Sequence, residues 1–153
     1  MLSNNHIKIS FENDLKSNFD LLMKKINNKK ILVIGGAGSI GGSYIKQVLM
    51  FKPSSICIVD TNENGLTELT RDLRSSNLLD YNPEYITYPV NLSSDTFEKI
   101  FISESWQVVA NFSAHKHVRS EKDKISVEAL IKNNVFGAIK LLNLCHLNPP
   151  KYF

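Results

Sequence analysis

The fold of this chain is decided by the stretch Lys30-Ile31-Leu32-Val33-Ile34-Gly35-Gly36-Ala37-Gly38-Ser39-Ile40-Gly41. In it, a short apolar run passes directly into a loop with glycines at positions 35, 36, 38 and 41. This pattern predicts a buried β-strand, a tight turn and a helix that begins near Ser39. Glycine suits such a turn, allows a ligand to approach the backbone closely, and lets the helix pack closely on the strand.

The spacing Gly36-x-Gly38-x-x-Gly41 matches the glycine pattern of dinucleotide-binding loops. A second apolar strand, Ile56-Cys57-Ile58-Val59, ends at Asp60, nineteen residues after Gly41. In such loops an acidic residue at roughly this distance (~20 residues) hydrogen-bonds the adenosine ribose. We therefore expect a diphosphate to bind the N–H groups at the start of the helix, at Ser39 and Ile40. The alternative is a simple helix-capping turn followed by a surface aspartate.

Two other kinds of glycine-rich loop fit the sequence less well. A P-loop carries Lys and then Ser or Thr after its last glycine, and no such pair follows Gly41. A methyltransferase usually has an acidic residue just before its loop, where this chain has Val33 and Ile34.

The rest of the chain alternates strands with helices behind an N-terminal helix. Strands are expected over residues 30–34, 56–59, 85–90 and 108–112, and helices over 11–27, 40–51, 63–76, 96–102 and from 127 to just before Pro149. This alternation predicts an α/β fold, a Rossmann-type doubly wound parallel sheet in the strand order 3-2-1-4.

The chain is predicted to have two parts. Residues 1–28 would form an N-terminal extension with an amphipathic helix, which either packs on the body or serves self-association into a homo-oligomer. Residues 29–153 would form one cofactor-binding domain. Because the chain stops where a fifth strand would begin, we expect it to be a fragment without its substrate domain.

Composition narrows the class of protein. The formal net charge is +3 and the basic residues are scattered, so no nucleic-acid partner is expected. Cys57 and Cys145 follow no disulfide or metal pattern, which favours reduced thiols and a cytoplasmic location. No membrane span is expected. His115 and His117 have no third ligand at zinc spacing, so we expect no metal site and assign both to packing or to the solvent-exposed surface.

Three segments together resemble one known family. Asn111-Phe112-Ser113-Ala114-His115-Lys116-His117-Val118 is the most specific of them, and Asn133-Asn134-Val135-Phe136-Gly137 and Val59-Asp60-Thr61-Asn62 accompany it. They are similar to the CapD-type polysaccharide-biosynthesis branch of the extended short-chain dehydrogenases/reductases. Members of that branch are nucleotide-sugar 4,6-dehydratases and related epimerases. The resemblance covers about residues 18 to 153.

The resemblance implies a cofactor site for NAD, with NADP as the alternative. Gly35, Gly38 and Gly41 would contact the pyrophosphate, and Asp60 would bind the adenosine ribose. Asn91 and Leu92 stand where the family commonly has Asp-Val next to the adenine. The remaining implied site residues are Asn62 beside Asp60, Ser113 and Ala114 at the nicotinamide ribose, Lys116 toward that ribose or the substrate, and Asn134, which would hold the following helix to this loop.

The family's catalytic Tyr-x-x-x-Lys pair is absent, because none of the five tyrosines has a lysine four residues later. No catalytic residue is therefore assigned, and the chain alone is expected to bind cofactor without turnover. The resemblance implies a parent enzyme that dehydrates a nucleotide sugar such as UDP-N-acetylglucosamine. A nucleotide-sugar 4-epimerase and a non-catalytic NAD(P)-sensing module remain as alternatives.

Overall fold

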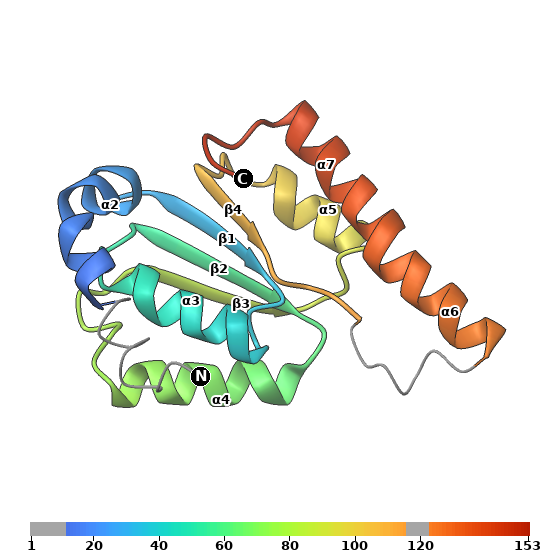
Figure 1. Cartoon of the computed structure of the whole chain (residues 1–153), viewed down its shortest axis with the longest axis horizontal. Helices are drawn as coiled ribbons and strands as arrows, with labels where there is room; N and C mark the ends of the chain where they lie inside the picture. Colours follow the sequence, from blue (N-terminus) through green and yellow to red (C-terminus); the bar gives the residue numbers. More distant parts are fainter. Residues whose placement is uncertain (1–11, 116–122) are drawn as a thin grey trace.

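The fold is centred on one parallel β-sheet, seen in a computed structural model that describes residues 12–115 and 123–153 (Figure 1). Its strands are β1 (Lys30–Ile34), β2 (Ser55–Asp60), β3 (Glu84–Pro89) and β4 (Val108–Asn111). All pair in parallel, in the order β3-β2-β1-β4. The predicted fold class and strand order are confirmed.

The central strands are apolar because both of their faces are covered. Ile31 pairs with Ile56 of β2 on one side and with Val108 of β4 on the other. The side chains of Ile31 and Leu32 have no exposed surface. Parallel strands buried on both faces read as continuous apolar runs, which explains the pattern of residues 31–34 and 56–59.

Helices form one layer on each face of the sheet. α3 (Ser39–Leu49) and α4 (Glu63–Ser75) contribute Ile45, Leu66 and Leu73 to one buried cluster, together with Ile31 and Val33 of β1. On the other face, α5 (Asp95–Ile102) and α7 (Gly137–Leu147) build a second cluster with Leu32 and Ile34 of the same strand. α3, α4 and α5 each begin within one residue of the predicted start.

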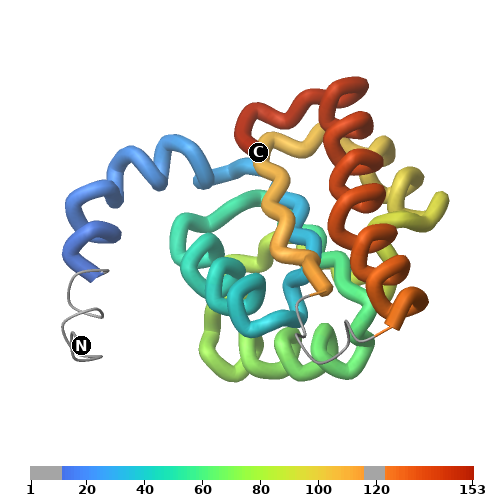
Figure 2. Tube along the Cα trace, turned by 45° about the vertical axis from the view of Figure 1, so that its right-hand side comes forward, coloured from blue at the N-terminus to red at the C-terminus, as the bar shows by residue number. Residues whose placement is uncertain are grey.

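The expected N-terminal helix is present in two pieces. Residues 12–17 are helical, the helix is interrupted at Asn18, and α2 (Phe19–Ile26) follows. Figure 2 shows this segment standing at the side of the molecule. The Phe19 ring lies 5.4 Å from that of Phe51, and Ile26 packs against the cluster beneath α3. No residue of α2 is fully buried, so its packing on the body is partial.

The helix after β4 differs from the expected single long helix. It consists of α6 (Lys124–Ile131), a π-helical turn η1 (Lys132–Phe136) and α7. A π-turn inserts one extra residue and is frequent at functional sites. Here the turn carries two neighbouring asparagines, Asn133 and Asn134, toward the end of β4.

The last residues of the chain return to the sheet. Tyr152 pairs in parallel with Val108, its carbonyl accepts the N–H of Val109 at 3.0 Å, and its own N–H donates to Gln107 at 3.0 Å. Within residues 12–115 and 123–153, no helix has the length and apolar character needed to cross a bilayer.

Candidate functional site

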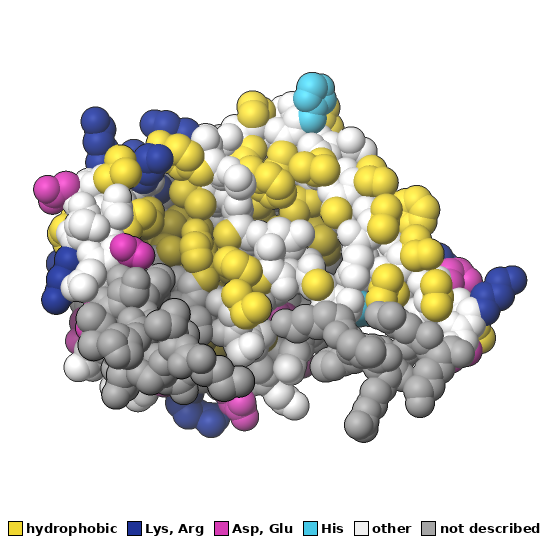
Figure 3. Space-filling view, viewed as in Figure 1, with side chains coloured by type: hydrophobic (Ala, Val, Ile, Leu, Met, Phe, Trp, Pro, Cys, Tyr) yellow, Lys and Arg dark blue, Asp and Glu magenta, His cyan; other side chains and the backbone are white. Residues whose placement is uncertain are grey.

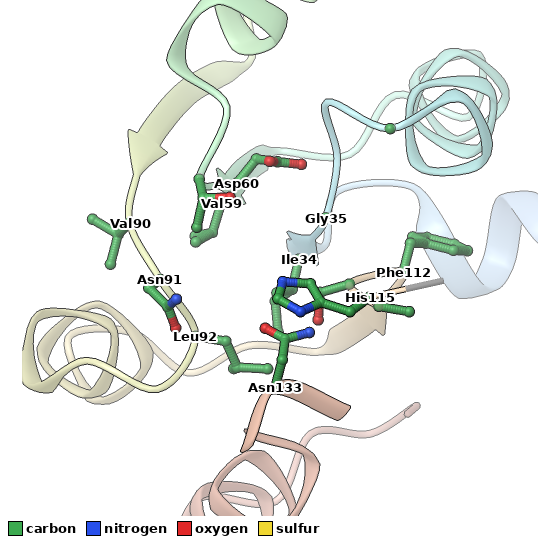
Figure 4. A pocket seen from close by; sticks show the side chains of 14 residues that line it. Ile34, Gly35, Val59, Asp60, Val90, Asn91, Leu92, Phe112, His115 and Asn133 are labelled. Carbon is green, nitrogen blue, oxygen red and sulfur yellow. The ribbon is translucent and has the colours of Figure 1, made fainter. Parts of the chain in front are cut away.

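A cavity of about 450 Å³ opens at the carboxyl ends of the strands (Figure 4). It lies where the strand order reverses between β1 and β4, the usual ligand position in open parallel sheets. Its walls come from the glycine loop and the segments after β2, β3 and β4, with one residue from the π-turn. They are Ile34, Gly35, Gly38, Val59, Asp60, Thr61, Val90, Asn91, Leu92, Phe112, Ser113, Ala114, His115 and Asn133.

Two glycines hold the loop in its shape. Gly35 has a φ of +76°, a left-handed conformation that disfavours other residues. A Cβ at this position would lie 2.5 Å from the backbone nitrogen of Ser113. A Cβ on Gly41 would collide with the carbonyl oxygen of Gly35, so Gly41 lets α3 pack closely on the loop.

Gly38 is different, because nothing in the fold requires it. Its φ of −73° suits any residue, and a Cβ would meet only the oxygen of Gly35, at 3.4 Å. The space above Gly38 belongs to the cavity. A glycine that the fold does not need, beside an open cavity, marks a position where a ligand approaches the backbone.

The start of α3 presents backbone N–H groups that have no acceptor within the helix. Gly38 is the N-cap and supplies no side-chain cap, and the first intrahelical bond that involves it is donated by Gly42 at 2.8 Å. The preceding N–H groups, those of Ser39, Ile40 and Gly41, therefore have no intrahelical acceptor. The Ile40 side chain does not line the cavity but faces the groove between α2 and α3.

Asp60 is fixed by the backbone around it. One carboxylate oxygen accepts the N–H of Ala37 in the glycine loop at 2.9 Å, and the other accepts the N–H of Asn62 at 2.9 Å. Each oxygen keeps a second lone pair for a ligand hydroxyl. The Asn62 side chain caps α4 by accepting the N–H of Gly65 at 2.9 Å, so it acts on the local fold and lies outside the cavity lining.

The segment after β4 is held by two asparagines. The backbone N–H and the hydroxyl of Ser113 both donate to the Asn111 amide oxygen, at 3.0 and 2.6 Å. Asn134 accepts the N–H of His115 at 2.8 Å and donates to its carbonyl at 2.9 Å. These bonds tie the π-turn to the loop, as the resemblance implies for Asn134. Lys116 lies outside the described residues.

Asn91 and Leu92 form the wall after β3. The Asn91 amide oxygen accepts the N–H of Ser93 at 2.7 Å. Leu92 is buried and packs toward the final helix, where a Cβ on Gly137 would lie 3.4 Å from it. The structure thus brings Gly35, Gly38, Asp60, Asn91, Leu92, Ser113 and Ala114 into one cavity.

Several residues of the cavity wall are not predicted site residues. Val59, Val90 and Phe112 are expected in strands, and only the cavity shows that they lie at its edge. His115 was assigned to packing or to the surface, whereas it lies in the cavity wall. Asn133 could have been found, since it stands next to Asn134.

Nucleophilic and metal chemistry find little support in the described part of the chain. No three metal-ligating side chains come together there. Burial raises the pKa of the Cys57 thiol to about 12, so it is not a thiolate nucleophile at neutral pH. Burial also raises the pKa of Tyr44, the opposite of what a tyrosine base needs. The site is suited to binding.

Two curated relatives are similar in sequence. The uncharacterized membrane protein MJ1061 of Methanocaldococcus jannaschii is 45% identical over 51 residues, 33% of this chain and 15% of that protein. The capsular polysaccharide biosynthesis protein CapD of Staphylococcus aureus is 28% identical over 124 residues, 76% of this chain and 19% of that protein. The chain therefore spans less than a fifth of either relative.

Solved structures share the fold. Pen from Bacillus thuringiensis superposes with a TM-score of 0.69 at 24% identity, over 83% of this chain and 38% of that one. The Bordetella bronchiseptica enzyme WbmF, solved with NAD+ and UDP, gives a TM-score of 0.62 at 16% identity, over 84% of this chain and 35% of its own. Residues 31–152 match the family model described as polysaccharide biosynthesis protein, and the chain belongs to that family.

Proposed function

We propose that this chain is the cofactor-binding part of an NAD-dependent enzyme that modifies a nucleotide sugar in polysaccharide biosynthesis. The observation that carries the proposal is the open space above Gly38, framed by the N–H groups of α3 on one side and the fixed Asp60 carboxylate on the other. This arrangement suits a diphosphate followed by a ribose.

The residues around the cavity fit a whole dinucleotide. The diphosphate would lie over residues 35–41, and the adenosine ribose would hydrogen-bond Asp60. Asn91 and Leu92 would contact the adenine, and Ser113 and Ala114 the nicotinamide ribose. Asn134 would act indirectly, by holding the backbone of His115 in place. Asn62 would set the position of Asp60 through its backbone N–H.

For the parent protein we propose a nucleotide-sugar 4,6-dehydratase acting on a substrate such as UDP-N-acetylglucosamine. NAD, when bound, supplies the hydride acceptor for oxidation of the sugar. The residues of this chain bind and orient the cofactor, and the proton-transfer pair that hydride removal needs is not among them. The name of CapD and the UDP in the WbmF structure support a nucleotide-sugar substrate. A 4-epimerase, which would share this cofactor half, is distinguished by its product.

Binding is tested with the variant Gly38→Val. The fold should tolerate this change, because the backbone at Gly38 is extended and its Cβ direction is open. The added methyl groups would fill the proposed diphosphate position, so NAD affinity should fall by at least about a hundredfold, roughly 2.7 kcal/mol. Isothermal titration calorimetry measures the loss, and circular dichroism checks the fold.

The matched control is Gly42→Ala in the same helix. A Cβ on Gly42 would make ordinary contacts, at 3.6 Å to Gly36 and Leu69, outside the cavity lining. This control should bind NAD as the unaltered chain does and gain about 1 kcal/mol of helix stability. Equal NAD affinity in Gly38→Val and the unaltered chain would contradict the proposed function.

A further inference from the structure

β3 forms one edge of the sheet in the described part of the chain, because only β2 pairs with it there (Figure 1). The N–H of Glu84, its first residue, donates to the carbonyl of Ser54 just before β2 at 3.0 Å. Residues of a parallel strand direct their backbone groups to alternate sides, so Tyr85 and Thr87 direct theirs away from β2. The edge therefore offers backbone donors and acceptors to another extended chain.

The two faces of the sheet at this edge differ in chemistry. Thr87 stands opposite Ile58, which belongs to the apolar layer of α3 and α4. Its neighbours Ile86 and Tyr88 point to the other face, where the side chain of Tyr88 is 38% exposed. A strand added to the edge would direct every second side chain toward α4 and the others toward this aromatic surface.

A groove of about 390 Å³ lies between α4 and this edge. It is lined by Thr67, Thr70, Arg71, Arg74 and Thr87. The four helical residues share one side of α4, since they are three or four positions apart. Neither Arg71 nor Arg74 forms an ion pair with another described residue. The groove therefore presents two guanidinium groups beside the backbone of the edge strand.

The neighbouring carboxylates leave the groove positively charged. Asp72 is paired with Lys46 on another side of α4. Glu68 is exposed and does not line the groove. Asp80 lies beyond Arg74, in a separate depression at the start of β3. An anionic ligand would therefore meet the guanidinium groups first.

We infer that the β3 edge binds an extended acidic peptide segment of a partner protein, which adds a strand to the sheet. The backbone of the peptide would pair with Tyr85 and Thr87. Its carboxylates would lie against Arg71 and Arg74, since a guanidinium forms paired hydrogen bonds with a carboxylate. Its alternate apolar side chains would cover Tyr88. In strand addition, main-chain bonds give affinity and alternate side chains give specificity. The inference is independent of the proposed cofactor binding.

The probe that tests this inference is a fluorescein-labelled hexapeptide of alternating valine and glutamate. Its control has lysine in place of each glutamate. Fluorescence anisotropy with the full chain should show saturable binding of the acidic peptide, with a Kd below about 1 mM. The lysine peptide should bind at least about tenfold more weakly, because its charges would face the two arginines.

The charge contacts are tested with the double variant Arg71→Gln, Arg74→Gln. Loss of both guanidinium groups should weaken binding of the acidic peptide at least about tenfold. Lys99→Gln, an exposed position of α5 on the other side of the sheet, is the matched control and should leave the affinity unchanged. NAD affinity should be the same in all three proteins, since none of these side chains lines the cofactor cavity.

Strand pairing is tested at Thr87. Proline is tolerated at an edge position whose N–H points away from the sheet, and Thr87→Pro removes only that donor from the edge. It should weaken peptide binding at least about fivefold, whereas Thr87→Val, which keeps the N–H, should not. If circular dichroism shows that Thr87→Pro does not fold, N-methylated probes replace it. Methylating the amides of one alternate set of peptide residues should abolish binding, and methylating the other set should not.

Three results would overturn the inference. The first is no binding of the acidic peptide up to about 1 mM. The second is equal binding in the double arginine variant and the unaltered chain. The third is binding that depends on the arginines but not on Thr87→Pro or on either set of N-methyl groups, which would show a site for free anions without strand addition. Binding that depends on both the charges and the alternate amides supports the inference.

Discussion

The Asp60 carboxylate is held in place by the protein's own backbone before any ligand contacts it. The N–H groups of Ala37 and Asn62 hold one oxygen each. A side chain anchored in this way cannot swing aside to make room for an additional anionic group. Its charge therefore stays at the position where the ribose hydroxyls of the proposed cofactor would bind.

This geometry predicts a preference for NAD over NADP. The 2′-phosphate of NADP would bring negative charge next to a fixed carboxylate, and like charges in such proximity are unfavourable. We expect the chain to bind NAD at least about tenfold more tightly than NADP, close to 1.4 kcal/mol. Asp60→Asn should narrow the difference, as measured by titration with both dinucleotides.

A nearby carboxylate serves as the control for this experiment. Glu63 lies in the first turn of α4 and does not line the cavity, so Glu63→Gln should leave the NAD to NADP ratio unchanged. NADP binding as tight as NAD binding in the unaltered chain would show that the fixed carboxylate does not select the cofactor.

Among single residues, those that act through their backbone were predictable from the sequence. The roles of Gly35 and Gly41 follow from steric rules that hold in any strand–turn–helix unit. The orientation of the Asn133 side chain could not be found in this way. It depends on a hydrogen bond to Asn134, whose amide oxygen also accepts the N–H of His115.

Among the elements, α6 begins at a well-formed cap. The Asp123 carboxylate accepts the N–H groups of Ile125 and Ser126 and the Ser126 hydroxyl, each at 2.9 Å. The backbone bond from Ser126 is the largest cause that lowers the Asp123 pKa below its ordinary value of 3.8. These hydrogen bonds stabilise the charged form of the Asp123 carboxylate in the folded helix.

The sign of the pH effect follows from this lowered pKa. The contribution of Asp123 to stability is present above pH 3.8 and is lost as the pH falls through the lower folded-state pKa. Hydrogen exchange at the Ile125 and Ser126 amides should accelerate, relative to their intrinsic rates, over that acidic window. In Asp123→Asn, whose cap does not titrate, this acceleration should disappear; its persistence would rule out Asp123 as the cause.

Element boundaries were largely predictable, whereas the π-turn was not. Apolar periodicity locates the helix starts to within about three residues, because burial sets both pattern and length. Residues 132–136 show no distinct pattern, since the turn is stabilised by tertiary bonds from Asn134 to the β4 loop. The break at Asn18 in the N-terminal helix was equally invisible to periodicity.

The helical segment from α6 to α7 also keeps apolar side chains on the surface. Figure 3 shows hydrophobic side chains along the outer side of α6 and α7. Ile131, Val135, Ile139 and Leu142 are each between 41% and 52% exposed. The inner side of α7 is separate from them and is formed by Leu141 and Leu144, which are buried against the sheet.

In the whole molecule, two apolar layers are separated by the sheet. Ile45 of α3 belongs to one layer, and Ile100 of α5 to the other. Substitutions without shared partners have additive effects on stability. We expect Ile45→Val and Ile100→Val to cost about 0.5–1.5 kcal/mol each. Chemical denaturation of the double variant should give their sum within about 0.5 kcal/mol.

A pair within one layer provides the comparison. Ile45 and Ile58 both contact the position that a Cβ on Gly36 would take, so they meet in the same part of the core. Ile45→Val with Ile58→Val should depart from additivity. Strong coupling between Ile45 and Ile100 would show that the sheet transmits packing changes from one face to the other.

β1, like its neighbour β2, packs against both apolar layers. Ile31 and Val33 are fastened on one face and Leu32 and Ile34 on the other, and Gly35 follows immediately. A ligand bound at the glycine loop is therefore attached directly to a strand that both layers need in order to stay packed. Ligand binding in the cavity is therefore linked by mass action to unfolding of the whole molecule, and not to local unfolding of one helix layer.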